Sequence, residues 1–421
     1  MAFTFQGNSM QYASLAGKFF SLMFFTFTIS VQALEPNSES NKLAKNALIV
    51  DTHIDVPFRV YRNPDIDVTQ PTVGGDFDLY RAKAGGLNVA FQSIYIPASV
   101  DEEGNAKTMA DELIDLVHGI VEKAPESLAV ATCVADIYAQ QNAGLISFPM
   151  GMENGAPIEG DLKNVNYFRK RGIRYITLAH SKSNHISDSS YDPNERWNGL
   201  SDFGKTLVLE MNKQGIMIDI SHITDSAAWQ VLELSKTPVI ASHSSLRFFV
   251  PGFHRNMRDD MVTALGENGG VIQINFGSGF LTSAARTWST QRTEDLKNFK
   301  EKNQLEDKDP AVTEFTEQWT AKRPYPYATL SDVLDHIDRA VKLAGVDHVG
   351  IGSDYDGVGA TLPVDLKDVQ SYPNLILGLR SRGYSDRNIE KILGGNIMRV
   401  WSEVEEFAEQ QGVKPICHHK A

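Results

Sequence analysis

Histidine and acidic side chains follow most of the apolar runs in this 421-residue sequence, at the positions where the runs end. The first pair is His53 and Asp55, which come after the apolar run 47–50. Alternate side chains of a strand share a face, so this imidazole and this carboxylate form half of a site for a divalent cation. A lone pair of this kind would equally suit a strand end that faces water. The feature recurs, however, at the ends of five later runs, in Glu153, His180, Asp219 with His222, His243, and Asp354.

Five of these side chains have the composition of a two-metal site: His53, Asp55, Glu153, His222 and His243. Two cations about 3.5–4 Å apart need a shared anionic ligand. We expect Glu153 to be that bridge, because Gly151 and Gly155 let the backbone turn beside it. Histidines with carboxylates and without thiolates favour zinc, with manganese or cobalt as substitutes. A bridging hydroxide would then be the nucleophile, and Asp354 would pass its proton to the leaving nitrogen.

These side chains can share one location only if the apolar runs are neighbouring strands. Eight such runs recur along the chain, at 47–50, 88–96, 146–152, 173–178, 216–220, 239–241, 270–275 and 349–352. Continuous hydrophobicity is typical of parallel strands that are covered on both faces. Helical patterns lie between the runs, with polar starts and glycine stops at 201–215, 331–345 and 385–394. The alternation predicts an α/β fold, a (β/α)8 TIM barrel, with a doubly wound open sheet as the main alternative.

We assign residues 34–408 to one barrel domain with insertions. Residues 282–328 contain no strand-like run and are rich in charge, which is typical of a lid near the barrel mouth or of a solvated surface excursion. The end of the chain, residues 409–421, is predicted to be a disordered tail.

The N-terminal stretch predicts export. Lys18 precedes the apolar run 19–31, and Val31-Gln32-Ala33 resembles a cleavage site of small residues. The run is shorter than the roughly 20 residues that span a bilayer. We therefore expect residues 1–33 to be a signal peptide, and the mature protein to be periplasmic or secreted without a stable membrane anchor. An exported chain could pair its two cysteines, Cys133 and Cys417.

The charge balance excludes one class of partner. The net charge is −13 and no long basic run occurs, whereas nucleic-acid binding requires clustered Lys and Arg. The remaining composition is that of an ordinary globular protein.

Six motifs occur in a fixed order: Val50-Asp51-Thr52-His53-Ile54-Asp55, Gly151-Met152-Glu153-Asn154-Gly155, Ile220-Ser221-His222, Ala241-Ser242-His243-Ser244, His254-Arg255-Asn256 and Gly350-Ile351-Gly352-Ser353-Asp354-Tyr355-Asp356-Gly357. Together they resemble the membrane (renal-type) dipeptidase family of zinc metallopeptidases, peptidase family M19, over residues 45–402. The resemblance implies that His53 and Asp55 hold one zinc ion, that His222 and His243 hold the other, and that Glu153 bridges them. It also implies that His180 binds substrate and stabilises the oxyanion of the tetrahedral intermediate, that Arg255 binds the substrate's C-terminal carboxylate, and that Asp354 shuttles the proton.

The resemblance predicts hydrolysis of small dipeptides, including those with a C-terminal D-residue, and a homodimer. In one place the chain differs: Gly277 follows Phe276, where mammalian-type members carry a tyrosine that helps to hold the carboxylate. One alternative is a metal-dependent amidohydrolase that acts on another small amide, lactam or lactone, although no lysine ends a strand here to serve as the bridge that many of those enzymes use. A barrel decayed into a binding module is the other alternative, and its ligands would be expected to be missing.

Overall fold

The structure is a computed structural model, and it describes residues 38–418. The predicted signal peptide, residues 1–33, lies outside the described residues. No helix between residues 38 and 418 is both long enough and apolar enough to cross a bilayer.

Eight parallel strands close into a barrel, because β1 pairs with β10 on one side and with β2 on the other. This closure confirms the predicted (β/α)8 barrel and excludes the open doubly wound sheet. The barrel strands are β1 (Ile49–Ile54), β2 (Leu87–Tyr95), β5 (Met150–Glu153), β6 (Ile173–Thr177), β7 (Met217–Asp219), β8 (Ile240–Ser244), β9 (Val271–Ile274) and β10 (Val349–Ile351). Two short strands, β4 (Ile146–Phe148) and β3 (Leu128–Val130), extend the sheet outward from β2.

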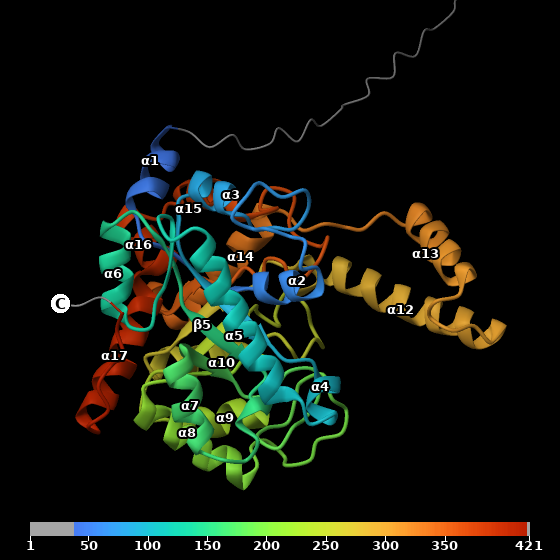
Figure 1. The fold of residues 1–421 in the computed structure, drawn as a ribbon. Coiled ribbons are helices and arrows are strands. Elements are labelled where there is room, and N and C mark those ends of the chain that lie inside the picture. Colours follow the sequence, from blue (N-terminus) through green and yellow to red (C-terminus); the bar gives the residue numbers. More distant parts are fainter. Residues whose placement is uncertain (1–37, 419–421) are drawn as a thin grey trace, which may run out of the picture. The chain divides into compact units, whose positions relative to one another are not determined.

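Helices surround the barrel (Figure 1). They are α1 (Ser38–Asn46), α2 (Val56–Arg62), α3 (Leu79–Gly85), α4 (Ala98–Glu102), α5 (Ala106–Lys123), α6 (Val134–Asn142), α7 (Lys163–Arg171), α8 (Asp202–Gln214), α9 (Asp225–Leu234), α10 (Asp259–Glu267), α11 (Ser278–Leu281), α12 (Ser283–Asn303), α13 (Pro310–Lys322), α14 (Leu330–Ala344), α15 (Tyr372–Ser381), α16 (Asp386–Glu390) and α17 (Asn396–Gln410). Short 3-10 turns are η1 (Ala156–Ile158), η2 (Val346–His348) and η3 (Val369–Ser371), and a π-helical turn, η4 (Lys391–Gly395), joins α16 to α17.

Local sequence signals account for several helix boundaries. The Ser201 hydroxyl caps α8 by accepting from the Gly204 N–H at 2.9 Å, and Gly215 ends the helix at φ 70°. The helix expected at 331–345 starts one residue earlier, at Leu330, because Thr329 and Asp332 form a capping box before α14.

Helix α17 closes the end of the barrel opposite the strand carboxyl ends. Its Trp401 packs in one hydrophobic cluster with Ile240 and Val271, the first residues of β8 and β9. The Trp401 ring lies 5.4 Å from the Phe91 ring, which in turn lies 5.6 Å from Tyr175 inside the barrel. Aromatic side chains therefore fill the barrel from α17 upward.

The predicted strand 146–152 is divided into two strands with different neighbours. β4 pairs with β2 and with β3, whereas β5 joins the barrel between β2 and β6. Pro149 separates them because it has no N–H to donate, although its carbonyl still accepts from the Gln92 N–H at 2.8 Å. Strand β3 had not been predicted, since three residues are too few for a clear pattern.

Gly394 does not end a helix, contrary to our expectation for 385–394. It lies in η4, where a Cβ atom would come within 2.5 Å of the Leu48 carbonyl oxygen. Glycine therefore allows η4 to pack closely against the chain that leads into β1.

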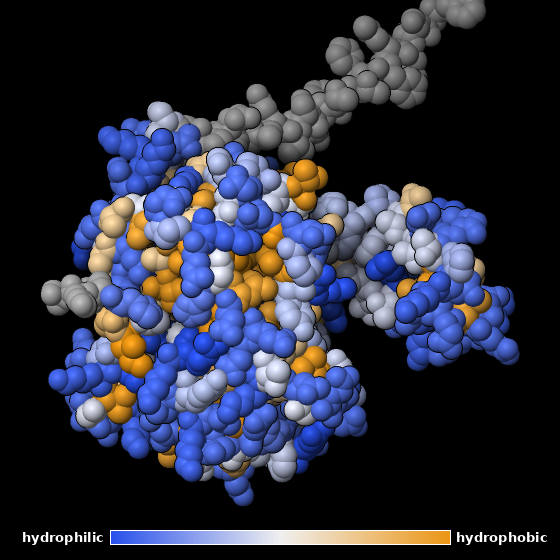
Figure 2. Space-filling view, viewed as in Figure 1, coloured by the Kyte–Doolittle hydropathy of each residue, from blue (hydrophilic) through white to orange (hydrophobic). Residues whose placement is uncertain are grey.

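The insertion 282–328 forms two helices, α12 and α13, which extend from the barrel as an arm (Figure 1). The outer surface of this arm is largely hydrophilic (Figure 2). Residues 416–418, which follow α17, contact the barrel domain, whereas we had predicted a disordered tail over 409–421. A disulfide joins Cys417 to Cys133, and the Thr132 hydroxyl donates to the Ile416 carbonyl oxygen at 2.7 Å.

Candidate active site

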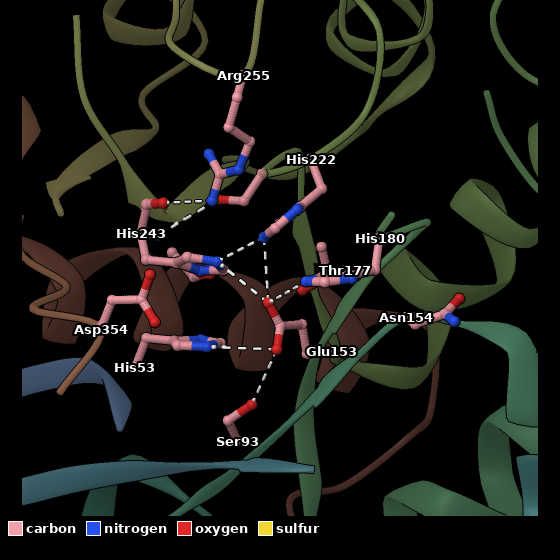
Figure 3. A network of polar contacts seen from close by, with 12 residues as sticks. His53, Ser93, Glu153, Asn154, Thr177, His180, His222, His243, Arg255 and Asp354 are labelled. Atoms are coloured by element: carbon pink, nitrogen blue, oxygen red, sulfur yellow. Dashed lines mark hydrogen bonds and ion pairs between the residues drawn. The ribbon is translucent and has the colours of Figure 1, made fainter. Parts of the chain in front are cut away.

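Glu153, the last residue of β5, lies at the centre of a buried polar cluster at the carboxyl ends of the strands (Figure 3). Its Oε1 lies 3.1 Å from His222 Nε2 and 3.2 Å from His243 Nε2. Its Oε2 faces the other way, 3.5 Å from His53 Nε2. The two oxygens of one carboxylate therefore face two separate sets of imidazoles.

The remaining predicted site residues adjoin this centre. His53 Nε2 lies 3.4 Å from Asp55 Oδ2, and His180 Nε2 lies 3.4 Å from Glu153 Oε1. Asp354 faces the same cluster, and its Oδ2 accepts from the Asn275 amide at 2.7 Å. The structure thus brings together seven of the predicted site residues: His53, Asp55, Glu153, His180, His222, His243 and Asp354.

A buried hydroxyl orients His53. The Tyr175 hydroxyl donates to the Thr52 carbonyl oxygen at 3.0 Å, so it accepts from the Nδ1–H of His53 at 2.8 Å. The Nε2 atom of His53 therefore faces Glu153 and Asp55. This Nε2 is buried and has no hydrogen-bond partner within residues 38–418.

His243 is oriented by an analogous relay. The Ser242 hydroxyl donates to Asp219 Oδ2 at 2.6 Å and accepts from the Nδ1–H of His243 at 2.7 Å. Asp219 is itself fixed at the end of β7 by the backbone N–H groups of Ser221 and Ser242, at 3.0 and 2.8 Å. Outer contacts of this kind commonly set the tautomer of a histidine that binds a metal.

Two site residues adopt left-handed backbone conformations, which residues other than glycine rarely adopt. His222 has φ 71° and Asp354 has φ 64°, and each lies just beyond the end of its strand. Such conformations cost about 1–3 kcal/mol each and concentrate at functional sites. Gly357 shows a related constraint, because a Cβ atom there would lie 2.2 Å from Asp354 Oδ1 and 2.3 Å from Asp55 Oδ2. Only glycine leaves room for both carboxylates.

Burial and charge set the protonation of the cluster. Burial alone would raise the pKa of Glu153, but the surrounding imidazoles, His53 first, hold it well below its ordinary value. Burial lowers the pKa of His222 and of His243 well below the ordinary value, and it is assisted by Arg255 at His222 and by His53 and then Arg255 at His243. Burial also lowers the pKa of His53, but Tyr175, Glu153 and Asp55 outweigh it and raise the pKa. A divalent cation at His53 would displace that proton.

The donor set fits divalent cations. Ligand atoms of three triads each lie within 4.8 Å of one another, and these triads are His53–Glu153–His243, Glu153–His180–His222 and His53–Asp55–Asp354. The triads overlap at Glu153 and His53, so they form one continuous set of nitrogen and oxygen donors. The unpartnered Nε2 of His53 and the space that Gly357 leaves between two carboxylates are what a bound cation requires.

A cavity of about 880 Å³ opens onto this cluster, which is the size range of small-molecule sites. Glu153, His180, His222 and Asp354 form its floor. Arg255 is 3% exposed beside the floor, where it donates to the Ser244 hydroxyl and to the His243 carbonyl oxygen, both at 2.6 Å. Its Nε has no partner within the described residues.

A closed parallel barrel with buried histidines and carboxylates at its mouth is the architecture of metal-dependent hydrolases. The model of one such family, membrane dipeptidase (peptidase family M19), matches residues 37–414. The chain therefore belongs to the membrane dipeptidase family and is a metallopeptidase of the dipeptidase class.

Relatives and solved structures agree with this assignment. The chain is 32% identical to dipeptidase tcpJ of Claviceps purpurea, over 83% of this chain and 75% of that protein. It is 30% identical to dipeptidase 3 of Mus musculus, over 89% of this chain and 68% of that protein. The crystal structure of the probable dipeptidase PvdM from Pseudomonas aeruginosa superposes with a TM-score of 0.75 at 28% identity and covers 88% of this chain and 98% of that one.

Sequence reasoning missed the residues that orient the ligands. Tyr175 lies inside the apolar run 173–178 and Ser242 directly follows the run 239–241, and neither residue type signals a role there. Asp219 was noted as a strand-end acid, but its contact with Ser242 depends on the register between β7 and β8. Arg286 also lines the cavity, and it had been counted only as part of a charged insertion.

Proposed function

We infer that this protein is a zinc-dependent dipeptidase with two metal ions. His53 and Asp55 would hold one ion, His222 and His243 would hold the other, and Glu153 would bridge them. The observation that carries this inference is the orientation of Glu153, whose two oxygens face the two histidine sets separately. Bound zinc ions would lower the pKa of water and polarise the scissile carbonyl group.

The protein's own residues would position the dipeptide and move its proton. The Arg255 guanidinium suits bidentate binding of the substrate's free carboxylate, which is what distinguishes a dipeptide from a longer chain. His180 lies on the cavity floor, where its Nε2 would donate to the oxygen that becomes negatively charged in the tetrahedral intermediate.

Asp354 would act as the general base and then as the general acid. Burial raises the pKa of its carboxyl to about 7, while His53 opposes the shift and Asp55 adds to it. Bound cations would lower this value again. Asp354 would accept a proton from the attacking water and deliver it to the leaving nitrogen, while the Asn275 amide holds the carboxylate in place.

We also propose that the protein is exported, and that it accepts dipeptides with a D-residue at the C-terminal position. The Cys133–Cys417 disulfide supports export, because such bonds persist mainly in oxidising compartments.

A dipeptide panel tests the proposed function. We expect zinc-loaded protein to release free amino acids from dipeptides, the chelated protein to be inactive, and added zinc to restore activity. Full activity after verified metal removal would eliminate the mechanism. Turnover of lactones or lactams with dipeptides untouched would instead indicate an amidohydrolase of another specificity.

A further inference from the structure

The base of the arm, and not its tip, belongs to the cavity. Arg286 and Ser289, in the first turns of α12, line one wall together with Tyr325, which follows α13. The insertion therefore enters and leaves the barrel domain beside this cavity. Its contribution to the cavity wall includes one cation.

Arg286 is held on an aromatic ring and is free for an anion. Its Cζ lies 3.9 Å from the centre of the Phe253 ring, a cation–π contact that fixes the plane of the guanidinium. Across residues 38–418, no carboxylate forms an ion pair with Arg286. By contrast Arg59, which also lines the cavity, donates to Asp356 at 2.9 Å and to backbone carbonyls.

Arg286 and Arg255 are linked by two neighbouring aromatic rings, Phe253 and Phe280, which both line the cavity. The Arg255 Cζ lies 5.4 Å from the Phe280 ring, and the Phe280 and Phe253 rings meet edge to face at 5.5 Å. Each guanidinium thus has its own ring in one continuous wall. A ligand that pairs each guanidinium with its own carboxylate carries two anionic groups.

We propose that Arg286 is a specificity-determining residue, which binds an acidic side chain on the C-terminal residue of the dipeptide. This inference rests on the proposed function, in which Arg255 holds the α-carboxylate of that same residue. The side chain of the substrate's C-terminal residue then lies along the Phe280 and Phe253 rings and extends toward Arg286. The acids of the cavity floor oppose this attraction little, because bound cations would neutralise them. The substrates selected are dipeptides that end in aspartate or glutamate.

Two isosteric dipeptides, glycyl-glutamate and glycyl-glutamine, test the proposal. Each is used with an L- and with a D-residue at the second position, and the ratio of their kcat/KM values is measured for zinc-loaded protein. We expect the wild type to prefer glycyl-glutamate, and Arg286→Gln to lower that preference roughly tenfold, since a charge-assisted contact is lost. Arg292→Gln is the matched control, with the same change on the same helix outside the cavity, and it should keep the wild-type ratio.

An unchanged ratio in Arg286→Gln would overturn the proposal. An equal loss on both dipeptides would also overturn it, because it would assign Arg286 to the α-carboxylate or to packing. Arg286→Lys, which keeps the charge, should retain part of the preference. If zinc-loaded wild type hydrolyses no dipeptide, the proposed function fails by itself. The two dipeptides then serve as ligands in calorimetry, where equal affinity for both would overturn the role of Arg286.

Discussion

Glu153 is the side chain on which the other site residues converge, since it contacts four imidazoles and the Ser93 hydroxyl. Its two oxygens face opposite halves of the cluster, so replacing Glu153 by an uncharged residue affects both halves at once.

Replacement of Glu153 by Gln keeps the shape of the side chain but removes the charge shared by the two cation sites. We expect metal content to fall at both sites, from two ions per chain toward none, and dipeptidase activity to fall with it. Elemental analysis after dialysis measures the occupancy. Glu159→Gln, an exposed acid in the loop after β5, is the control and should keep its metal. Two full equivalents in Glu153→Gln would contradict the bridging role.

The Tyr175 hydroxyl fixes the tautomer of His53, and its removal should weaken metal binding without removing a ligand. For Tyr175→Phe we expect about 10- to 100-fold lower zinc affinity, the usual effect of removing an outer contact. Competition with a chromogenic chelator measures it. Tyr372→Phe provides a comparison, because that buried hydroxyl bonds to Asp51 at 2.7 Å and touches no predicted ligand. Equal zinc affinity in Tyr175→Phe and wild type would be inconsistent with the relay.

At this scale the sequence is informative about the ligands and uninformative about their supports. Histidines and acids at the ends of apolar runs stand out by type, so the five predicted ligands, His180 and Asp354 could be selected. Tyr175 and Ser242 look like ordinary strand residues. Their roles depend on neighbours that are 122 positions away for the His53–Tyr175 pair, and on hydroxyl directions that only the packed barrel fixes.

Among the elements, the C-terminal segment is tied to the barrel domain by more than one kind of contact. Cys133 caps α6 by accepting from the Asp136 N–H at 3.3 Å, and its disulfide to Cys417 spans 284 positions of the sequence. The backbone N–H of His418 donates to Asp136 Oδ1 at 2.9 Å. Cys417 and His418 therefore lie beside the start of α6.

Loss of this disulfide should lower stability by about 2–4 kcal/mol, because the unfolded chain is freed from a very long loop. The double variant Cys133→Ser with Cys417→Ser removes the bond, while the serine hydroxyl can still cap α6. Thermal unfolding with and without reductant measures the effect. Reductant should lower the midpoint of the wild type and leave the double variant unchanged. A reductant-insensitive wild type would show that the bond does not stabilise the fold.

Element existence was predictable where periodicity and caps agreed, as for α8 between Ser201 and Gly215. It was not predictable where an apolar run changes partners. The run 146–152 looks like one strand, but Pro149 divides it between an outer sheet and the barrel. Gly394 looked like a helix stop, whereas its lack of a side chain serves close packing against the Leu48 carbonyl.

For the whole molecule, the predicted metal ligands come from four different strands or the loops that follow them: β1, β5, β7 and β8. Bound cations would join these strands at the barrel mouth, while α17 packs at the other end. Zinc that binds the folded chain more tightly than the unfolded chain must therefore stabilise the fold.

We expect zinc to raise the free energy of unfolding by about 2.7 kcal/mol per site when free zinc is 100 times the dissociation constant. Urea unfolding in zinc buffers of increasing concentration measures the gain. Glu153→Gln should lose most of this gain in the free energy of unfolding, but it should still fold because its barrel core is unchanged. Identical unfolding midpoints with and without zinc would contradict the assignment of the cluster as a metal site.

The barrel was predicted from eight apolar runs that alternate with helical patterns. The prediction that the sheet closes depended on the number of runs, and no single run indicated it. The path of the insertion was not predictable, since its charge pattern suits a lid and a solvated excursion equally. The structure places the first turns of α12 and Tyr325 in the cavity wall, and the rest of α12 and α13 in the arm.

This arrangement places the reaction and the choice of substrate in different segments of the chain. The residues proposed to act on the peptide bond come from the barrel strands or the loops that follow them, whereas Arg286 comes from a segment that leaves the barrel and returns to it. Changes in the arm can therefore alter which dipeptides are accepted without altering the reaction. We expect related chains with different arms to differ in substrate specificity while they share the same chemistry.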